Sequence, residues 1–429
     1  MNISLCTTGC RTNQEEIETL RAALGHAGFT IVSDVAQADA VVVNSCSVTS
    51  HAEANVRRLL HAVARRSPRA KILITGCMAQ QYGASLIKAG SVISWVVGNA
   101  CKQSIPAILR DHRGGIFLDE INREPLSVPT VINAPLPGKR TRFQIKIQEG
   151  CDNTCAYCIV PMVRGQSRCA KTIDILDSCN RALDAGYKEI VLTGTHIGRF
   201  RDTKNNDGLL SLVERLMRIR GDFRLRLSSL DPAEISGELL ALAAAGGKLC
   251  DHLHVSLQSL SAEVLEFMNR RSEMPDGMVE KLAGFRRRRP LAGLGADFIV
   301  GFPGETDAMF ETTLRNAETI GFSYAHIFRF SARPGTAAAV LPHKIPETVK
   351  RMRSGQLRAV IEKSRAKFIE AQKTGPRRII VEQGRPVRGV TSNYLRVELC
   401  GVTAVYNSWL DVVIEGTAGS GKYCRARGV

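Results

Sequence analysis

The amino-terminal third of the chain alternates short apolar, β-branched runs with longer segments in which apolar residues recur at helical spacing. The longer segments, 13–27 and 51–66, predict amphipathic helices. Because parallel strands need helical crossovers between them, this alternation predicts an α/β domain built on a parallel sheet. The strands expected in this sheet are residues 3–6, 29–32, 40–44, 71–75 and 94–97.

The same alternation returns in the middle of the chain and continues for six units. Six strand-plus-helix units predict an open, partial TIM barrel, (β/α)6, with its chemistry at the carboxyl ends of the strands. The expected strands are residues 143–148, 189–193, 224–228, 252–257, 295–301 and 324–330. Helical patterns lie between them, for example at residues 172–185, 208–218, 262–268 and 307–320.

The carboxyl-terminal pattern differs from both. A helical stretch rich in Lys and Arg, 344–373, is followed by short strands at 377–382, 389–391 and 394–399. Gly and Asn separate these strands, which is typical of a small all-β barrel. The charge of the basic stretch is otherwise no more than that of a solvated helix face.

Residues 100–137 carry no clear long element and are expected to form a linker. Their second half contains four prolines, Pro125, Pro129, Pro135 and Pro137. The predicted domains are therefore residues 1–137, which include the linker, residues 138–373, which include the basic helix, and residues 374–429.

Composition and charge suggest a partner. The chain has 429 residues, with 58 Lys and Arg against 41 Asp and Glu, which gives a net charge of +17. This surplus favours a polyanion through phosphate neutralisation, and simple solubility is the alternative. No stretch approaches the roughly 18 apolar residues of a membrane span, so no membrane partner is expected. Thirteen cysteines, and no signal-peptide pattern at the start, indicate a cytoplasmic protein.

Cys151, Cys155 and Cys158 lie on a predicted loop directly after the strand 143–148. Three thiols in the spacing C-x3-C-x2-C are soft ligands suited to an iron–sulfur cluster. A [4Fe–4S] cluster held by three cysteines keeps one iron open for a substrate or cofactor. The alternatives are a zinc knuckle or three unrelated buried thiols, but no fourth Cys or His at close spacing completes a structural zinc site.

Three further cysteines, Cys10, Cys46 and Cys77, each follow a predicted strand of the amino-terminal sheet. Ligands of an open parallel sheet gather at the carboxyl ends of its strands, so these thiols are expected to converge on a second cluster. Taken singly, each is better explained as a small buried hydrophobe. The remaining seven cysteines lack such a setting and are interpreted as structural.

The two cysteine triplets and the motifs around them resemble the radical S-adenosylmethionine (SAM) tRNA methylthiotransferase family over almost the whole chain. The strongest pieces are the C-x3-C-x2-C loop, with Tyr157 before its last thiol, and the second triplet in Gly-Cys, Asn-x-Cys and Gly-Cys-x-Ala-Gln settings. Segments 8–14 and 192–198 look most like the branch that acts on N6-threonylcarbamoyladenosine at tRNA position 37. One departure is Gln258-Ser259-Leu260, where the family usually has Gly at the third place.

This resemblance implies two [4Fe–4S] clusters, SAM and a radical reaction that replaces the hydrogen at C2 of the modified adenine with a methylthio group. Sulfur would come from the second cluster and the methyl group from a second SAM, so no catalytic residue is assigned beyond the clusters. Six residues, each otherwise an ordinary strand-end or turn residue, are implied to contact SAM. They are Tyr157, Arg168, Ser229, Gln258, Gly301 and Glu305.

The carboxyl-terminal strands resemble the TRAM module, most clearly at 389–394, which implies binding of the tRNA anticodon loop. A structural β cap is the alternative. The resemblance also implies an electron donor and a sulfur source for the second cluster. Rival functions are methylthiolation of isopentenyladenosine-37 tRNA or of a ribosomal protein, and a non-enzymatic Fe–S or zinc RNA-binding protein.

Residues 416–422 mimic a phosphate-binding Walker A loop. The next residue, Tyr423, stands where Mg²⁺ binding requires Ser or Thr. A glycine-rich β turn is therefore expected at this place.

Overall fold

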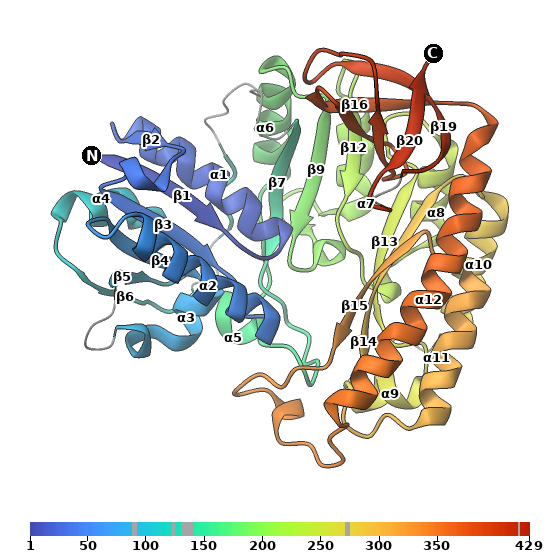
Figure 1. Ribbon diagram of the computed structural model, residues 1–429, viewed down its shortest axis with the longest axis horizontal. Coiled ribbons are helices and arrows are strands. Elements are labelled where there is room, and N and C mark those ends of the chain that lie inside the picture. Colours follow the sequence, from blue (N-terminus) through green and yellow to red (C-terminus); the bar gives the residue numbers. More distant parts are fainter. Residues whose placement is uncertain (88–91, 122–124, 130–140, 271–274, 419–420) are drawn as a thin grey trace.

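The computed structural model describes the chain except for residues 88–91, 122–124, 130–140, 271–274 and 419–420. An amino-terminal parallel sheet, a central barrel of parallel strands and a small carboxyl-terminal β-barrel follow one another along the sequence (Figure 1). The predicted α/β fold class, with an all-β part at the carboxyl-terminal end, is confirmed.

Six strands form the amino-terminal sheet, and every neighbouring pair is parallel. Apolar residues of the helices α1 (Arg11–His26) and α4 (Ile105–Asp111) pack on one face, and those of α2 (Ser50–Arg66) and α3 (Cys77–Tyr82) pack on the other. The strands, in spatial order, are β2 (Thr30–Val32), β1 (Asn2–Thr7), β3 (Ala40–Ser45), β4 (Lys71–Gly76), β5 (Ile93–Val97) and β6 (Gly115–Phe117).

The prediction of a linker over residues 100–137 is wrong in its first part, because residues 105–117 belong to the sheet domain. Helix α4 buries Ile105, Ile108 and Leu109, and β6 pairs in parallel with β5. An element of seven residues and a strand of three are too short to show a clear period, so the sequence pattern concealed them. Pro135 and Pro137 lie outside the described residues.

The central barrel contains the six predicted parallel strands. They are β7 (Arg142–Glu149), β9 (Glu189–Gly194), β12 (Arg224–Leu227), β13 (His252–Gln258), β14 (Gly293–Val300) and β15 (Tyr324–Arg329). The six strands lie in two hydrogen-bonded sheets, because β12 and β13 are joined only by isolated bridges. A short strand, β8 (Arg168–Cys169), adds an antiparallel neighbour to β7 that the pattern did not predict.

Helices cover the outside of the barrel strands. In α7 (Leu209–Met217), for example, Leu209, Leu212, Val213 and Leu216 recur at helical spacing and are buried in the barrel core. The remaining helices of this layer are α6 (Thr172–Asp184), α8 (Gly237–Ala245), α9 (Ala262–Phe267), α10 (Pro275–Arg288) and α11 (Asp307–Ile320).

The basic stretch forms a single helix, α12 (Glu347–Ala371), which packs beside α11 and β15 (Figure 1). Among the described residues, no helix has the length together with the hydropathy that a membrane span requires. After α12, the predicted small β-barrel is confirmed, although two of its five strands were missed. Its strands are β16 (Pro376–Gly384), β17 (Val387–Thr391), β18 (Arg396–Leu399), β19 (Trp409–Thr417) and β20 (Cys424–Gly428).

The expected glycine-rich turn lies between β19 and β20, which are antiparallel neighbours. Tyr423 accepts a hydrogen bond from Ala418 through its backbone carbonyl, at 2.9 Å. The Walker-like residues therefore close a hairpin, while Gly419 and Ser420 within them lie outside the described residues.

A buried cluster of charge joins the carboxyl-terminal barrel to the central one. Glu189, at the start of β9, is fully buried and pairs with Arg224 (2.5 Å) and Arg226 (2.7 Å) of β12. The two guanidinium groups also donate to backbone carbonyl oxygens at positions 390–392, at 2.8–3.1 Å. These arginines hold the end of β17 against the amino-terminal ends of the barrel strands.

Replacing Glu189 with Gln is expected to destabilise the fold, because two buried guanidinium groups lose their counter-charge. Removal of one partner from a buried ion pair costs about 3–5 kcal/mol. The measurement is the midpoint of urea unfolding, followed by circular dichroism. The matched control is Glu280→Gln, since Glu280 pairs with Arg287 on the exposed face of α10 and its loss costs less than about 1 kcal/mol. Equal shifts in the two variants would contradict this role of Glu189.

Candidate functional site

The first cysteine triplet lies on a loop that directly follows β7. Gly150 starts the loop with φ of 77°, and a Cβ at this place would collide with the backbone of Gln166. The backbone N–H of Cys151 donates to the carbonyl oxygen of Gly165 at 3.1 Å, and that of Cys158 donates to Cys155 at 3.0 Å. The loop is therefore a tight turn that only Gly can begin.

Hydrogen bonds and apolar contacts hold this loop against the far side of the barrel. Ala156 donates to the carbonyl oxygen of Met268 at 2.9 Å and accepts from Ala338 at 2.7 Å. Its side chain is packed in a small cluster with Phe302 and Phe330. The thiols of Cys151 and Cys158 each lie 3.4 Å from a backbone N–H two residues further on, a donor that stabilises a thiolate.

Tyr157 is fixed by Arg270. The guanidinium group of Arg270 donates to the Tyr157 hydroxyl at 3.1 Å and lies 3.8 Å from the Cys155 sulfur. Its other nitrogen pairs with Asp231 at 3.0 Å and reaches the carbonyl oxygen of Ser256 at 2.9 Å. Burial raises the pKa of Tyr157 well above its usual value although Arg270 opposes the shift, so this side chain is a neutral phenol.

His196 is a site residue to which the sequence analysis gave no role. Its Nδ1 atom lies 3.4 Å from the Cys151 sulfur, and its Nε2 atom lies 2.7 Å from a carboxylate oxygen of Glu234. Because β7, β9 and β12 are neighbours in the barrel, their carboxyl ends bring these three residues together. The strand-end position of His196 was the only available signal, since Glu234 lies on a short 3-10 turn without a motif.

The predicted SAM contacts at positions 229, 258 and 301 follow or end three successive barrel strands, on the side where the cysteine loop lies. Ser229 follows β12, Gln258 ends β13 with φ of 64°, and Gly301 follows β14 with φ of 72°. Leu260, at the family's usual Gly place, is buried in the barrel core, and the left-handed residue of this turn is Gln258. The departure from the family pattern therefore leaves the turn intact.

Two other predicted contacts are already engaged with protein groups. The Glu305 carboxylate accepts from the backbone N–H of Gly301 at 2.6 Å and pairs with Arg353 of α12 at 2.7 Å. Arg168, on β8, pairs with Glu149 at 2.9 Å. Both side chains stabilise the walls of the site in this structure.

The second triplet converges at the carboxyl edge of the amino-terminal sheet. Cys10 precedes α1, Cys46 follows β3 and Cys77 begins α3. A Cβ on Gly9, which has φ of 106°, would collide with the Cys46 side chain. Burial raises the pKa of Cys46 to about 12, and the nearby thiols of Cys77 and Cys10 add to the shift. Three thiols at one edge of the sheet fit a cluster that they hold as thiolates.

The short helix α5 (Val160–Arg164), which directly follows the first triplet, links the two cysteine sites. Ile159 and Val163 pack against Cys77 in one buried cluster. The side chain of Arg164 is only 3% exposed, and it donates to Asn13 at 2.8 Å. The same Asn13 oxygen accepts from the Cys10 thiol at 3.4 Å. Residues directly after the loop of the first triplet therefore form one wall of the second site.

Buried charges fix this contact between the sheet domain and the barrel. Arg164 pairs with Glu16 of α1 at 2.8 Å and with Glu149 of β7 at 2.5 Å. Lys146 pairs with both carboxylates at 3.2 Å, and Lys102 pairs with Glu16 at 2.7 Å. Burial alone would raise the pKa of Glu16, but Arg164 and Lys102 hold it well below its usual range, so the carboxylate is ionised.

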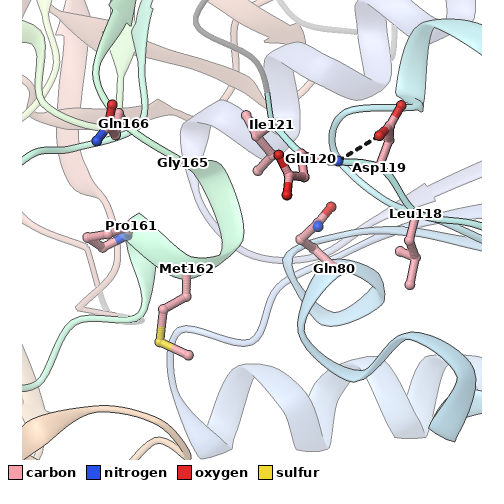
Figure 2. Close-up of a pocket in the computed structure, with 9 residues that line it drawn as sticks. All are labelled: Gln80, Leu118, Asp119, Glu120, Ile121, Pro161, Met162, Gly165 and Gln166. Atoms are coloured by element: carbon pink, nitrogen blue, oxygen red, sulfur yellow. Dashed lines mark hydrogen bonds between the residues drawn. The ribbon is translucent and has the colours of Figure 1, made fainter.

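Two cavities lie along this contact between the sheet domain and the barrel. One, of about 590 Å³, has a charged lining that includes Glu16, Lys102, Lys146, Glu149 and Arg168. The other, of about 650 Å³, lies between α3 and α5, and Figure 2 shows Gln80 and Glu120 on one side of it with Pro161 and Met162 on the other. None of the six cysteines lines either cavity, so the cavities flank the thiol sites.

Two family models match separate parts of the chain. Residues 2–98 match an uncharacterized protein family, UPF0004, and residues 145–317 match the radical SAM superfamily. Among solved structures, the radical SAM methyltransferase TsrM from Kitasatospora setae shares the fold, with a TM-score of 0.58 at 15% identity over 79% of this chain and 77% of that chain.

Several relatives are similar over most of their length. The threonylcarbamoyladenosine tRNA methylthiotransferase MtaB of Thermotoga maritima is 35% identical, over 90% of this chain and 88% of the relative. The protein of the same name in Aquifex aeolicus is 33% identical, over 94% and 98%. The tRNA-2-methylthio-N(6)-dimethylallyladenosine synthase of Thermodesulfovibrio yellowstonii is 34% identical, over 81% and 80%.

A barrel of parallel strands that matches the radical SAM superfamily, with a cysteine triplet after its first strand, defines a radical SAM enzyme. The amino-terminal match and the relatives narrow this class. The chain belongs to the radical SAM tRNA methylthiotransferase family, on the branch of the threonylcarbamoyladenosine enzymes. Two [4Fe–4S] clusters and SAM are its cofactors, and the two thiol triplets fit the clusters.

Replacing Gly9 with Ala is expected to abolish the second cluster, because the added methyl group collides with the Cys46 side chain and φ is 106°. Iron should fall from about eight atoms per chain to about four, the content of one cube. Iron and sulfide analysis of the reconstituted protein measures this loss. The control is Gly28→Ala, at φ of 84° with nothing within 4 Å of the new methyl group, which keeps the full iron content. Equal iron in both variants would refute the crowding at Cys46.

Proposed function

We propose that this chain adds a methylthio group to C2 of N6-threonylcarbamoyladenosine at position 37 of tRNA. The observation that carries the proposal is the pair of cysteine triplets that meet across α5, one after the first barrel strand and one at the edge of the sheet. A single triplet serves many radical reactions, whereas a second one beside it suits sulfur insertion. The names of the relatives supply the nucleoside.

In this proposal Cys151, Cys155 and Cys158 hold the cluster that binds SAM, and Cys10, Cys46 and Cys77 hold the second cluster. When bound, these groups supply radical formation, sulfur and the methyl group. The protein supplies position: Arg164 and its two carboxylates set the separation of the two sites, and Arg270 holds the neutral phenol of Tyr157 while it also reaches the Cys155 sulfur.

We assign SAM contacts to Ser229, Gln258 and Gly301, which lie at the carboxyl ends of three neighbouring strands, as well as to Tyr157. Glu305 and Arg168 act there through the groups they hold: Glu305 fixes the backbone N–H of Gly301, and Arg168 fixes Glu149 beside the loop. For either side chain to contact SAM directly, it has to leave its ion pair, with Arg353 for Glu305 and with Glu149 for Arg168.

The partner in this proposal is the anticodon loop of a tRNA in the cytoplasm. The net charge of +17 and the closed carboxyl-terminal β-barrel support it. Reduction of the first cluster needs an electron donor, and rebuilding of the second cluster needs a sulfur source. In this proposal each predicted domain has one task. Residues 1–137 hold the cluster that supplies sulfur, residues 138–373 form the radical, and residues 374–429 bind the tRNA.

The direct test is mass spectrometry of tRNA nucleosides from a strain that lacks the gene. Loss of the 2-methylthio form of threonylcarbamoyladenosine, with its return on complementation, is the expected result. Loss of the methylthio form of isopentenyladenosine instead would assign the chain to the neighbouring branch. Unchanged tRNA nucleosides would leave a ribosomal protein or a non-enzymatic role and would overturn the proposal.

Two cysteine variants separate the roles of the triplets. With SAM and dithionite, Cys77→Ala is expected to form 5′-deoxyadenosine but no methylthio nucleoside, whereas Cys155→Ala forms neither. The readouts are chromatography of 5′-deoxyadenosine and mass spectrometry of the tRNA. Cys179→Ala is a control, since this buried thiol in α6 belongs to the barrel core. Sulfur insertion by Cys77→Ala at the wild-type rate would refute the second site.

Point substitutions test the tRNA role of the β-barrel better than its deletion, because deletion would leave Arg224 and Arg226 without their backbone acceptors. Arg396 and Arg427 are exposed on β18 and β20. If each contacts one phosphate, Arg→Gln lowers the slope of log affinity against log salt by about one. Filter binding over a salt series measures the slope, and a slope equal to that of the wild type in both variants would support a structural cap.

A further inference from the structure

The inner face of β15 carries exposed rings, and its two ends lie near residues that adjoin the two cysteine sites. Ala325 and Ile327 point outward and pack against the barrel core. Since side chains alternate along a strand, Tyr324, His326 and Phe328 share the opposite face, toward the barrel interior. Side-chain exposure is 57% for His326, and Phe328 is 41% exposed.

The two ends of this face are closed by protein. At the amino-terminal end of β15, Tyr394 of the carboxyl-terminal barrel covers Tyr324 at 5.6 Å between ring centroids. Arg11, the neighbour of Cys10, donates to the Tyr394 hydroxyl at 3.0 Å. Thus all three parts of the chain meet at this end, beside one residue of the second cysteine triplet.

At the other end, the residue after β15 belongs to the same apolar cluster as the loop of the first cysteine triplet, residues 150–158, which we call the radical loop. Phe330 packs in one cluster with Ala156, which lies between Cys155 and Tyr157. Phe328 precedes Phe330 by two residues and shares its face of the strand, so it lies roughly 7 Å from Phe330 toward the amino-terminal end of β15. The exposed rings therefore lie between Ala156 of the radical loop and the end that Arg11 closes next to Cys10.

Hydrogen bonds hold the histidine of this face in a fixed orientation. His326 Nδ1 lies 3.0 Å from an Asp297 oxygen, which also lies 3.1 Å from His254 Nε2. The other nitrogen of His254 bonds the Tyr324 hydroxyl at 2.9 Å. The His326 ring is thereby presented beside Phe328, with 6.4 Å between ring centroids.

We propose that His326 and Phe328 form the stacking surface for the nucleobase to be modified, an adenine that carries the threonylcarbamoyl group on N6. This inference rests on the proposed function, because it takes its nucleoside from there. An RNA base that reacts has to leave its stack, and splayed bases in loops stack on aromatic side chains. A guanidinium group at the end of the face, Arg11, complements the phosphates that flank such a base.

The test uses reconstituted protein and an anticodon stem-loop that contains threonylcarbamoyladenosine at position 37. Phe328→Ala is expected to weaken binding about 5- to 150-fold, the effect of losing one base–aromatic stack. Phe328→Tyr should bind close to wild type. Phe267→Ala is the matched control, because Phe267 is 42% exposed on the outer helix α9. Iron content should stay that of the wild type in all three variants, and 5′-deoxyadenosine formation without tRNA should stay unchanged in Phe267→Ala.

A second measurement reports stacking itself. A stem-loop with 2-aminopurine at position 37 loses fluorescence when the base stacks, so binding by the wild-type protein should quench it more than binding by Phe328→Ala. Equal affinity and equal quenching in wild type and Phe328→Ala would overturn this inference alone. If wild-type protein fails to bind the modified stem-loop better than an unrelated hairpin, the proposed function fails, and this inference fails with it.

Discussion

The arrangement of the whole site depends on one buried cation, Arg164. It lies six residues after the last cysteine of the radical loop, yet its charge is neutralised by Glu16 from the sheet domain and Glu149 from the barrel. A guanidinium group that is only 3% exposed is tolerated only where such partners and hydrogen bonds are in place. The sheet domain and the barrel are therefore held in one relative position, with Cys77 of the second triplet packed against the helix that follows the first triplet.

Much of this arrangement could be predicted, because periodic patterns and cysteine spacing are local signals. The parallel strands, the closed carboxyl-terminal barrel and the convergence of Cys10, Cys46 and Cys77 at strand ends all follow from them. The roles of Arg164, His196 and Arg270 could not be predicted this way. Each acts through partners on other elements, such as Glu16 for Arg164, and no spacing in the sequence brings those pairs together.

Short or interrupted elements are a second kind of feature that the sequence patterns could not predict. Helix α4 and strand β6 were hidden in a supposed linker, and β8 has only two residues. The division of the barrel between β12 and β13 was also hidden, since both segments read as ordinary strands. Tertiary contacts, more than intrinsic propensity, decide these places.

The contact between the two barrels has a consequence for how the sequence can vary. Arg224 and Arg226 recognise positions 390–392 through backbone carbonyl oxygens, which every amino acid provides. The joint therefore requires a particular course of the main chain, to which the side chains of Ser392 and Asn393 add hydrogen bonds with the central barrel. Homologous chains can exchange exposed residues elsewhere on the small barrel, and so alter its outer surface, while its placement on the catalytic barrel stays the same.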